Sequence, residues 1–152
     1  MSVENVKEFF NEKGKDIEIL IFEDTSTVPK AAESLGVTEG EIAKSLLFKV
    51  KDSYALIIMA GDKRIDNRKF KDIFNTKAKM PEASEVAEVT GHPVGGVCPF
   101  GLKNPIPVYL DYSLKDYEHV FPAAGAPNLA VKLRVEELEC LTKGQWIDVA
   151  KE

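Results

Sequence analysis

The sequence holds few of the residues that build metal centres and disulfide frameworks. It has two cysteines, Cys98 and Cys140, and two histidines, His92 and His119. A structural zinc site needs four ligands at short spacing, and a disulfide framework needs several cysteine pairs. The sequence shows neither pattern, so we expect no metal, no cofactor and two reduced thiols.

Long apolar runs are also missing. No stretch approaches the roughly 20 apolar residues of a membrane-spanning helix, and the amino terminus lacks the basic start and apolar run of a signal peptide. These absences predict a cytoplasmic protein without a membrane partner. The chain has 152 residues, of which 44% are hydrophobic and 30% are charged, and this is typical of one folded domain over residues 1–152.

Positive charge is scarce overall but concentrated in one segment. The net charge of −5 argues against a protein that coats nucleic acid regardless of sequence, because phosphate contacts need basic residues. Residues 63–79 nevertheless carry seven basic and two acidic side chains. Such a strip is either a solvated helix face or a track for phosphates. The candidates for phosphate contacts are Lys63, Arg64, Arg68, Lys69 and Lys71.

Apolar periodicity and capping residues predict short helices that alternate with strands. We expect helices from Ser2 to about Gly14 and over 28–35, 66–74, 81–89 and 135–141, with one helical turn carrying Ile42, Ala43 and Lys44. We expect strands over 17–22, 46–50, 54–60, 106–110, 119–121, 128–133 and 146–149.

The strands 46–50 and 54–60 are separated by three residues, which predicts an antiparallel hairpin. The strand 54–60 is apolar on both faces, which indicates a central strand with cover on each side. The helices lack the length and even repetition of a doubly wound sheet. We therefore predict an α+β fold in which a curved mixed or antiparallel sheet forms a barrel-like core flanked by short helices.

Residues 91–104 form a loop rich in glycine, with four glycines and two prolines. Bare backbone N–H groups can approach and bind an oxyanion or a phosphate without a cation. The glycine spacing matches neither a Walker loop nor a dinucleotide-binding fingerprint. The alternative interpretation is a tight turn that covers the end of the barrel.

Two side chains near these segments are candidates for chemistry. Lys44 lies among apolar neighbours, where its amine would be partly desolvated and could meet a carbonyl oxygen or a phosphate, unless it simply extends to solvent. Cys98, with His92 six positions earlier, could form a nucleophilic pair. A small thiol that fills a loop pocket is the more common situation, and sequence separation does not establish a pairing in space.

Five segments together resemble the YbaK and prolyl-tRNA-synthetase-associated editing domains, which are trans-acting aminoacyl-tRNA deacylases. The segments are Ala31–Val37, Ile42–Phe48, Thr90–Gly101, Pro107–Leu114 and Phe121–Gly125. Each is modest alone, but their order and separation cover nearly the whole chain.

This resemblance implies a barrel-like mixed sheet with a pocket for the charged 3′ end of tRNA. The family's lysine falls on Lys44, and its Gly-x-x-x-Pro loop falls on Gly95 to Pro99. In these domains the loop amides steady the ester carbonyl while a water attacks with help from the terminal ribose hydroxyl, so the implied catalytic candidates are Lys44, Gly95 and Gly96. The implied substrate-binding candidates are Ser45, Val97, Cys98, Pro99, Phe100, Gly101, Asp111 and Gly125.

The resemblance therefore implies a hydrolase that removes a wrong amino acid from tRNA, with an aminoacyl-tRNA synthetase as a candidate partner. Two other functions stay open: a non-catalytic tRNA-binding or synthetase-associated module, and a binder of small molecules. Small or thiol-bearing amino acids are the first expectation for the substrate, although the sequence does not fix which amino acid or which tRNA. A monomer is the favoured oligomeric state.

Overall fold

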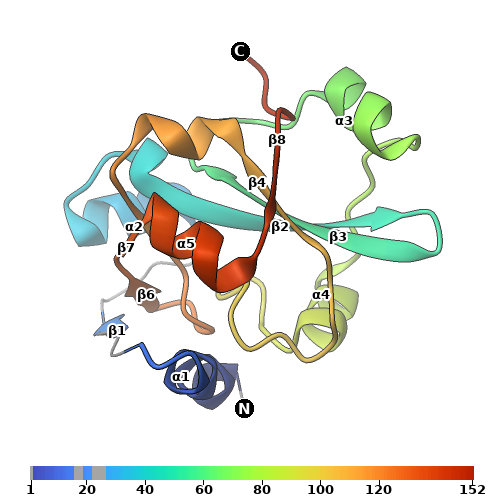
Figure 1. Ribbon diagram of the computed structural model, residues 1–152. Helices are drawn as coiled ribbons and strands as arrows, with labels where there is room; N and C mark the ends of the chain where they lie inside the picture. Colours follow the sequence, from blue (N-terminus) through green and yellow to red (C-terminus); the bar gives the residue numbers. More distant parts are fainter. Residues whose placement is uncertain (1, 16–18, 22–26) are drawn as a thin grey trace.

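The computed structural model describes residues 2–15, 19–21 and 27–152 (Figure 1). Its helices are α1 (Ser2–Glu12), α2 (Val28–Leu35), α3 (Asn67–Phe74), α4 (Ala83–Thr90) and α5 (Val135–Thr142), with the 3-10 turns η1 (Glu39–Glu41) and η2 (Tyr112–Asp116). Its strands are β1 (Ile19–Ile21), β2 (Ile42–Val50), β3 (Ser53–Ala60), β4 (Val108–Asp111), β5 (His119–Pro122), β6 (Leu129–Val131), β7 (Leu133–Arg134) and β8 (Gln145–Ile147). In the described part of the chain, no helix is both long and apolar enough to cross a membrane.

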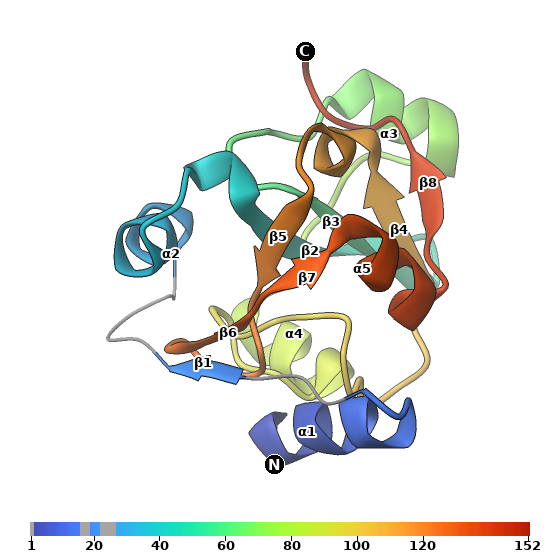
Figure 2. The ribbon, with the colours of Figure 1, turned by 60° about the vertical axis from the view of Figure 1, so that its left-hand side comes forward.

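Six of the strands form one mixed sheet in the order β7-β5-β2-β3-β4-β8. The hairpin β2–β3 is antiparallel, whereas β5 joins β2, β4 joins β3 and β8 joins β4 in parallel. A separate antiparallel pair is formed by β1 and β6. The sheet is strongly curled, as Figure 2 shows. The predicted α+β fold with a curved mixed sheet is therefore confirmed.

The two faces of β3 pack into different apolar clusters. Leu56 and Ile58 belong to the larger cluster, to which α1 and α5 also contribute. Ile57 points the other way and packs with Phe70 of α3. All three side chains are fully buried, which explains why this strand is apolar on both faces from Ala55 to Ala60 and confirms the prediction of a covered central strand.

Local capping signals set most helix boundaries as predicted. The Thr27 side chain accepts a hydrogen bond from the Lys30 N–H at the start of α2, and Gly36 ends this helix with φ 70°. The Asp66 carboxylate accepts from the Arg68 and Lys69 N–H groups and caps α3. The predicted strand 17–22 is observed over 19–21, and its other positions lie outside the described residues.

The predicted helical turn over Ile42, Ala43 and Lys44 is wrong. The capping box of Thr38 and Glu41 does form, but it initiates only the 3-10 turn η1. From Ile42 onward the backbone joins two ladders, with Ile42 opposite Phe121 and Ala43 opposite Ala60. Pairing with neighbouring strands supplies the backbone hydrogen bonds that a helix would otherwise provide, so tertiary structure overrides the local signal.

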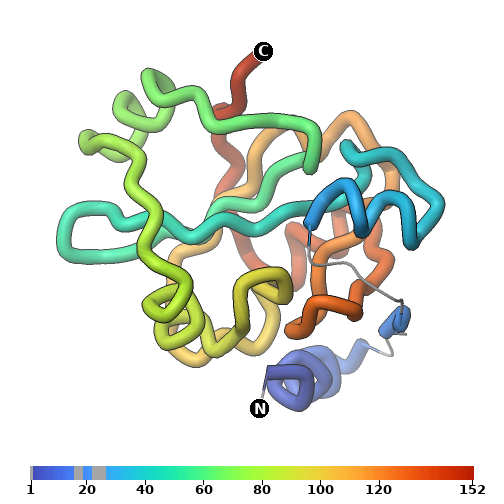
Figure 3. The backbone as a smooth tube through the Cα atoms, turned by 180° about the vertical axis from the view of Figure 1, so that it is seen from behind, coloured from blue at the N-terminus to red at the C-terminus, as the bar shows by residue number. Residues whose placement is uncertain are grey.

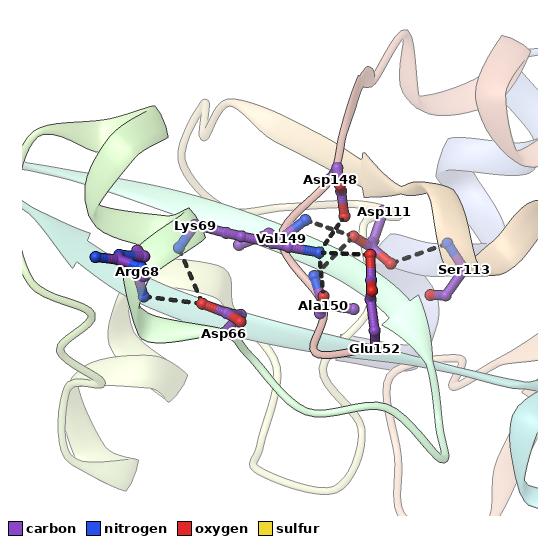
Figure 4. A network of polar contacts seen from close by, with 9 residues as sticks. All are labelled: Asp66, Arg68, Lys69, Asp111, Ser113, Asp148, Val149, Ala150 and Glu152. Atoms are coloured by element: carbon purple, nitrogen blue, oxygen red, sulfur yellow. Dashed lines mark hydrogen bonds and ion pairs between the residues drawn. The ribbon is translucent and has the colours of Figure 1, made fainter.

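A buried carboxylate, Asp111 at the end of β4, holds the C-terminal segment against the sheet. Asp111 is 1% exposed, and its Oδ1 accepts hydrogen bonds from the Val149 N–H (2.8 Å) and the Ala150 N–H (3.2 Å). Its Oδ2 accepts from the Ser113 N–H at 2.9 Å (Figure 4). The side chain thereby ties η2 and the chain end to the same strand.

We predict that Asp111→Ala destabilises the fold. Three backbone donors would lose a charged acceptor, and leaving buried donors unpaired costs about 3 kcal/mol or more in total. The free energy of unfolding, measured by urea denaturation, should fall by that amount. Asp148→Ala is the control, because Asp148 is exposed and its ion pair with Lys69 should contribute at most about 1 kcal/mol. Equal unfolding midpoints for the two variants would contradict this role for Asp111.

Candidate functional site

A cavity of about 260 Å³ lies between α2, β2, β5 and the glycine-rich loop. Most of its wall is aliphatic, and Lys44 is the only charged residue on its described lining. Ser45 and Gly95 line it as well, so the cavity brings together the two segments that the sequence singled out. Elsewhere in the described part of the chain, no group of three His, Cys, Asp or Glu side chains is arranged to hold a metal.

The Lys44 amine is fixed at the cavity wall by main-chain carbonyls. Its Nζ donates to the Gly61 carbonyl at 3.3 Å and to the Lys63 carbonyl. An ammonium has three N–H donors, so one remains for a ligand oxygen. Burial lowers the pKa of Lys44 from its ordinary value, the nearby Asp62 carboxylate opposes this, and Arg64 adds to the lowering.

The neighbouring hydroxyl of Ser45 is unusual because it has no partner. Within the described residues, Ser45 Oγ is the one buried side-chain nitrogen or oxygen that makes no hydrogen bond. Buried polar groups are nearly always paired, because an unpaired one costs free energy. Ser45 lines the cavity beside Lys44, and its unpaired hydroxyl oxygen is sealed from solvent.

The glycine-rich loop meets the cavity through a tight turn. The Gly96 N–H donates to the Pro93 carbonyl at 2.9 Å, and Gly95, the third residue of this turn, has φ +96°. A positive φ at this position is the requirement of a type II turn and favours glycine. Within the described residues, the Gly95 N–H has no acceptor. It is therefore available to a ligand.

Gly96 is needed for a different reason, namely the close approach of two backbones. A Cβ at Gly96 would lie 2.5 Å from the Ala126 nitrogen and 2.7 Å from the Gly125 carbonyl carbon. The Gly96 carbonyl accepts a hydrogen bond from the Gly125 N–H at 3.0 Å. Both polar backbone groups of Gly96 are thus used inside the fold, and the tight-turn interpretation describes this glycine better than ligand binding does.

Cys98 and His92 come close in space but are sealed from solvent. Both are 0% exposed, and the Cys98 Sγ lies 3.6 Å from the His92 Nε2. Burial raises the pKa of the Cys98 thiol to about 12. Burial also lowers the pKa of His92, although its hydrogen bond to the Phe100 carbonyl opposes this. A thiol that stays protonated is a poor nucleophile, so the geometry favours the packing role over the catalytic one.

The remaining substrate-binding candidates from the sequence divide into two groups. Ser45 and Val97 line the cavity. Phe100 is buried beside the rings of Phe9 and Phe10. Cys98, Pro99, Gly101, Asp111 and Gly125 are likewise absent from the cavity wall, and Pro99 and Gly101 line a separate open groove of about 880 Å³ beside α1.

Several cavity residues were missed by the sequence reasoning, and two of them stand out by their exposure. Met80 and Val94 line the cavity and are 55% and 58% exposed. Large apolar side chains left open at the mouth of a pocket commonly mark a contact surface. The position of Val94 inside the glycine-rich loop was the available signal, whereas nothing local to Met80 distinguished it from an ordinary surface residue.

The basic segment 63–79 is divided by the fold. Arg68 and Lys71 line a groove of about 660 Å³, together with Lys77. Lys69 points away and donates to the Asp148 carboxylate at 3.0 Å and the Ala150 carbonyl at 2.9 Å (Figure 4). The chain after α3 then crosses the back of the β2–β3 hairpin on its way to α4 (Figure 3). At this crossing the backbones of Lys49 and Lys79 form an isolated antiparallel β-bridge.

We predict that the two cysteines differ sharply in reactivity. Cys98 is buried with a pKa of about 12, so it remains a protonated and inaccessible thiol at pH 8, whereas Cys140 is exposed. Iodoacetamide at pH 8 should alkylate one thiol of the native protein and both after denaturation, as counted by mass spectrometry. Cys140→Ser should leave no fast-reacting thiol. Rapid modification of Cys98 in the native protein would contradict the sealed position.

Comparison with known proteins identifies the family. The sequence profile of the aminoacyl-tRNA editing domain matches residues 23–141. YwhH of Bacillus subtilis is 45% identical over 100% of this chain and 99% of its own length. EbsC of Enterococcus faecalis, described as a candidate Cys-tRNA(Pro)/Cys-tRNA(Cys) deacylase, is 29% identical over 89% of this chain and 84% of its own length.

The solved structures agree with the sequence relatives. The crystal structure of a candidate trans-editing enzyme for prolyl-tRNA synthetase has a TM-score of 0.92 and 30% identity, and the match covers 99% of this chain and 98% of that chain. The proline–tRNA ligase of Bacillus licheniformis is 29% identical over 74% of this chain, which corresponds to 19% of the ligase. The chain belongs to the family of aminoacyl-tRNA editing domains.

Proposed function

We propose that the protein is an aminoacyl-tRNA deacylase, which hydrolyses the ester of mischarged tRNA as part of translation quality control. The observation that carries the proposal is the meeting of Lys44, the unpaired Ser45 hydroxyl and the free Gly95 N–H on one apolar cavity. Family membership and the similarity to EbsC and to the trans-editing structure support it. Charged tRNA is found in the cytoplasm, which is the location we propose.

The chemistry needs position and charge stabilisation more than a nucleophilic side chain. A water attacks the ester carbonyl carbon with help from the free ribose hydroxyl beside the ester, the bond to the ribose oxygen breaks, and that oxygen takes a proton. The Gly95 N–H stabilises the developing oxyanion, and one such donor contributes roughly 2.7–4 kcal/mol. The third N–H of Lys44 holds a second substrate oxygen, and Gly96 positions the turn.

The size and lining of the cavity favour a small amino acid as the acyl group of the substrate. Its volume of about 260 Å³ lies below the roughly 300–1,000 Å³ of pockets that enclose a drug-sized ligand. We infer that the aminoacyl ribose enters, while the terminal base stays at the mouth beside Met80 and Val94. With Lys44 as the only charge on the described lining, a small uncharged or thiol-bearing amino acid fits best.

The groove that contains Arg68, Lys71 and Lys77 is the proposed track for tRNA phosphates. The chain that carries Lys77 continues directly to Met80 at the cavity mouth, so the groove leads toward the site. Basic side chains in such a groove position the nucleic acid without reading its sequence. Lys69 does not line this groove, and its ion pair with Asp148 favours a structural role over phosphate binding.

A panel of charged tRNAs tests the function directly. Single-turnover assays would follow amino acid release from tRNA(Pro) charged with cysteine, alanine or proline and from cognate controls. The proposal predicts fast release of at least one small mischarged amino acid and little release of proline. Binding of tRNA with no release above the spontaneous rate would instead support the non-catalytic module.

We predict that loss of the Lys44 ammonium abolishes most of the activity. Lys44→Met keeps the aliphatic stem, so deacylation should fall by at least about 100-fold, because one donor to a developing or bound charge is removed. Lys44→Arg retains donors for the two carbonyls and so protects the fold, but its planar group should restore little activity.

Lys49→Met is the matched control for this prediction. Lys49 lies on the same strand but pairs with Glu85 at 3.2 Å, and it is absent from the cavity wall. Its substitution should leave the deacylation rate within about twofold. If Lys44→Met remains folded and keeps more than half of the wild-type rate, Lys44 has no catalytic part.

We predict that reversing charge in the groove weakens tRNA binding rather than chemistry. The double variant Lys71→Glu and Lys77→Glu should raise the Kd for tRNA and reduce its dependence on salt, because fewer phosphates are neutralised. The single-turnover rate at saturating tRNA should be preserved. Lys69→Glu is the control, because Lys69 lies outside the groove. This variant should disturb the contact with Asp148 and leave the salt dependence of tRNA binding unchanged. Identical salt slopes for wild type and the double variant would show that the groove does not contact phosphates.

A further inference from the structure

A buried polar contact joins the first turn of α1 to the glycine-rich loop, and the proposed chemistry does not use it. The Ser2 Oγ lies 2.5 Å from the His92 Nδ1 and 2.7 Å from the Gly125 carbonyl oxygen. On the other side of the ring, the His92 Nε2 lies 2.7 Å from the Phe100 carbonyl oxygen. His92 is fully buried, so these partners replace its contacts with water.

The serine hydroxyl is the proton donor for two acceptors at this junction. The two carbonyls only accept, and the Phe100 carbonyl therefore requires the ring proton on Nε2. Burial favours the neutral ring, which then has no proton on Nδ1. The single Ser2 proton is left to serve both Nδ1 and the Gly125 carbonyl. Among the described residues, Ser2 is consequently the donor that these two acceptors share.

Backbone contacts extend this junction to the cavity. A Cβ at Gly125 would lie 2.8 Å from the Ser2 Oγ, and one at Gly101 would lie 2.4 Å from the Asn5 carbonyl oxygen, so α1 presses on both glycine turns. The Gly125 N–H donates to the Gly96 carbonyl at 3.0 Å, and Gly96 closes the turn that contains Gly95. A continuous set of contacts therefore runs from Ser2 through Gly125 to the cavity wall.

We propose that Ser2 is a positioning residue, whose hydroxyl fixes the Gly125 turn and the His92 ring and thereby orients the Gly95 N–H for ester hydrolysis. The catalytic part of this inference rests on the proposed deacylase function. A loose turn would still admit the substrate, since Lys44 and the basic groove are untouched. It would misplace the oxyanion donor, and small displacements of catalytic groups cost up to about 100-fold in rate.

The test uses Ser2→Ala, Ser2→Thr and the control Glu4→Ala, which lies exposed in the same helical turn. Ser2→Ala should lower kcat for a charged tRNA by about 10- to 100-fold with little change in KM. Ser2→Thr keeps the hydroxyl and should restore kcat to within about threefold of wild type. A change in unfolding free energy alone, with kcat unaltered in Ser2→Ala, would overturn the proposal.

A second measurement does not depend on activity. The exchange rate of the Gly125 amide hydrogen, followed by NMR, reports on its bond to the Gly96 carbonyl. This rate should rise at least about tenfold in Ser2→Ala and stay unchanged in Glu4→Ala. If the exchange rate in Ser2→Ala is unchanged, the positioning role is overturned, even if wild type hydrolyses no charged tRNA. If wild type is inactive but exchange is faster in Ser2→Ala, the result counts against the deacylase function alone.

Discussion

Two backbone turns cross so closely at Gly96 that a side chain there would collide with Gly125 and Ala126, while at Gly125 a positive φ and the first turn of α1 disfavour one. The crossing is held by the hydrogen bond between the Gly125 N–H and the Gly96 carbonyl and is backed by the first turn of α1. Gly95 reaches the cavity wall because Gly96 is fixed in this way. Lys44 reaches the same cavity from β2, a strand of the central hairpin, so Lys44 and Gly95 both line one small apolar space.

Different residues of the glycine-rich loop line the cavity and pack in the core. Gly95 and Val97 face the cavity, while Cys98 and Phe100 are fully buried behind it. The thiol is both inaccessible and protonated, so the loop offers backbone amides in place of a nucleophilic side chain. An ester is already activated toward hydrolysis, so the mechanism we propose needs only a positioned donor and a bound ammonium.

Local sequence signals predicted the features that depend on local physics. The Asp66 cap, the Gly36 helix end and the short loop of the β2–β3 hairpin each follow from a few adjacent residues, and all were observed. The tight turn that was the alternative interpretation of the glycine-rich loop is also present, with a positive φ at Gly95. The cavity pairing of Lys44 with the loop came from the resemblance to a family and not from spacing.

The features that sequence could not predict depend on contacts between distant segments. Ile42 to Lys44 extend β2 because strands elsewhere pair with them. Lys69 and Lys71 point to different sides of α3 because they are two positions apart on a helix, but the partner that Lys69 meets there, Asp148, lies 79 residues further along the chain. Asp111 lies inside a motif segment but serves the backbone of residues 149 and 150.

In the mechanism we propose, a water hydrolyses the ester with help from backbone donors and the substrate's own hydroxyl, and no nucleophilic side chain takes part. The most direct measurement compares single-turnover deacylation of a 3′-aminoacyl-tRNA that ends in adenosine with one that ends in 2′-deoxyadenosine. Substrate assistance predicts that the deoxy substrate binds with a similar Kd but reacts at least about 100-fold more slowly. Equal rates for the two substrates, or a trapped thioester on Cys98, would contradict the account.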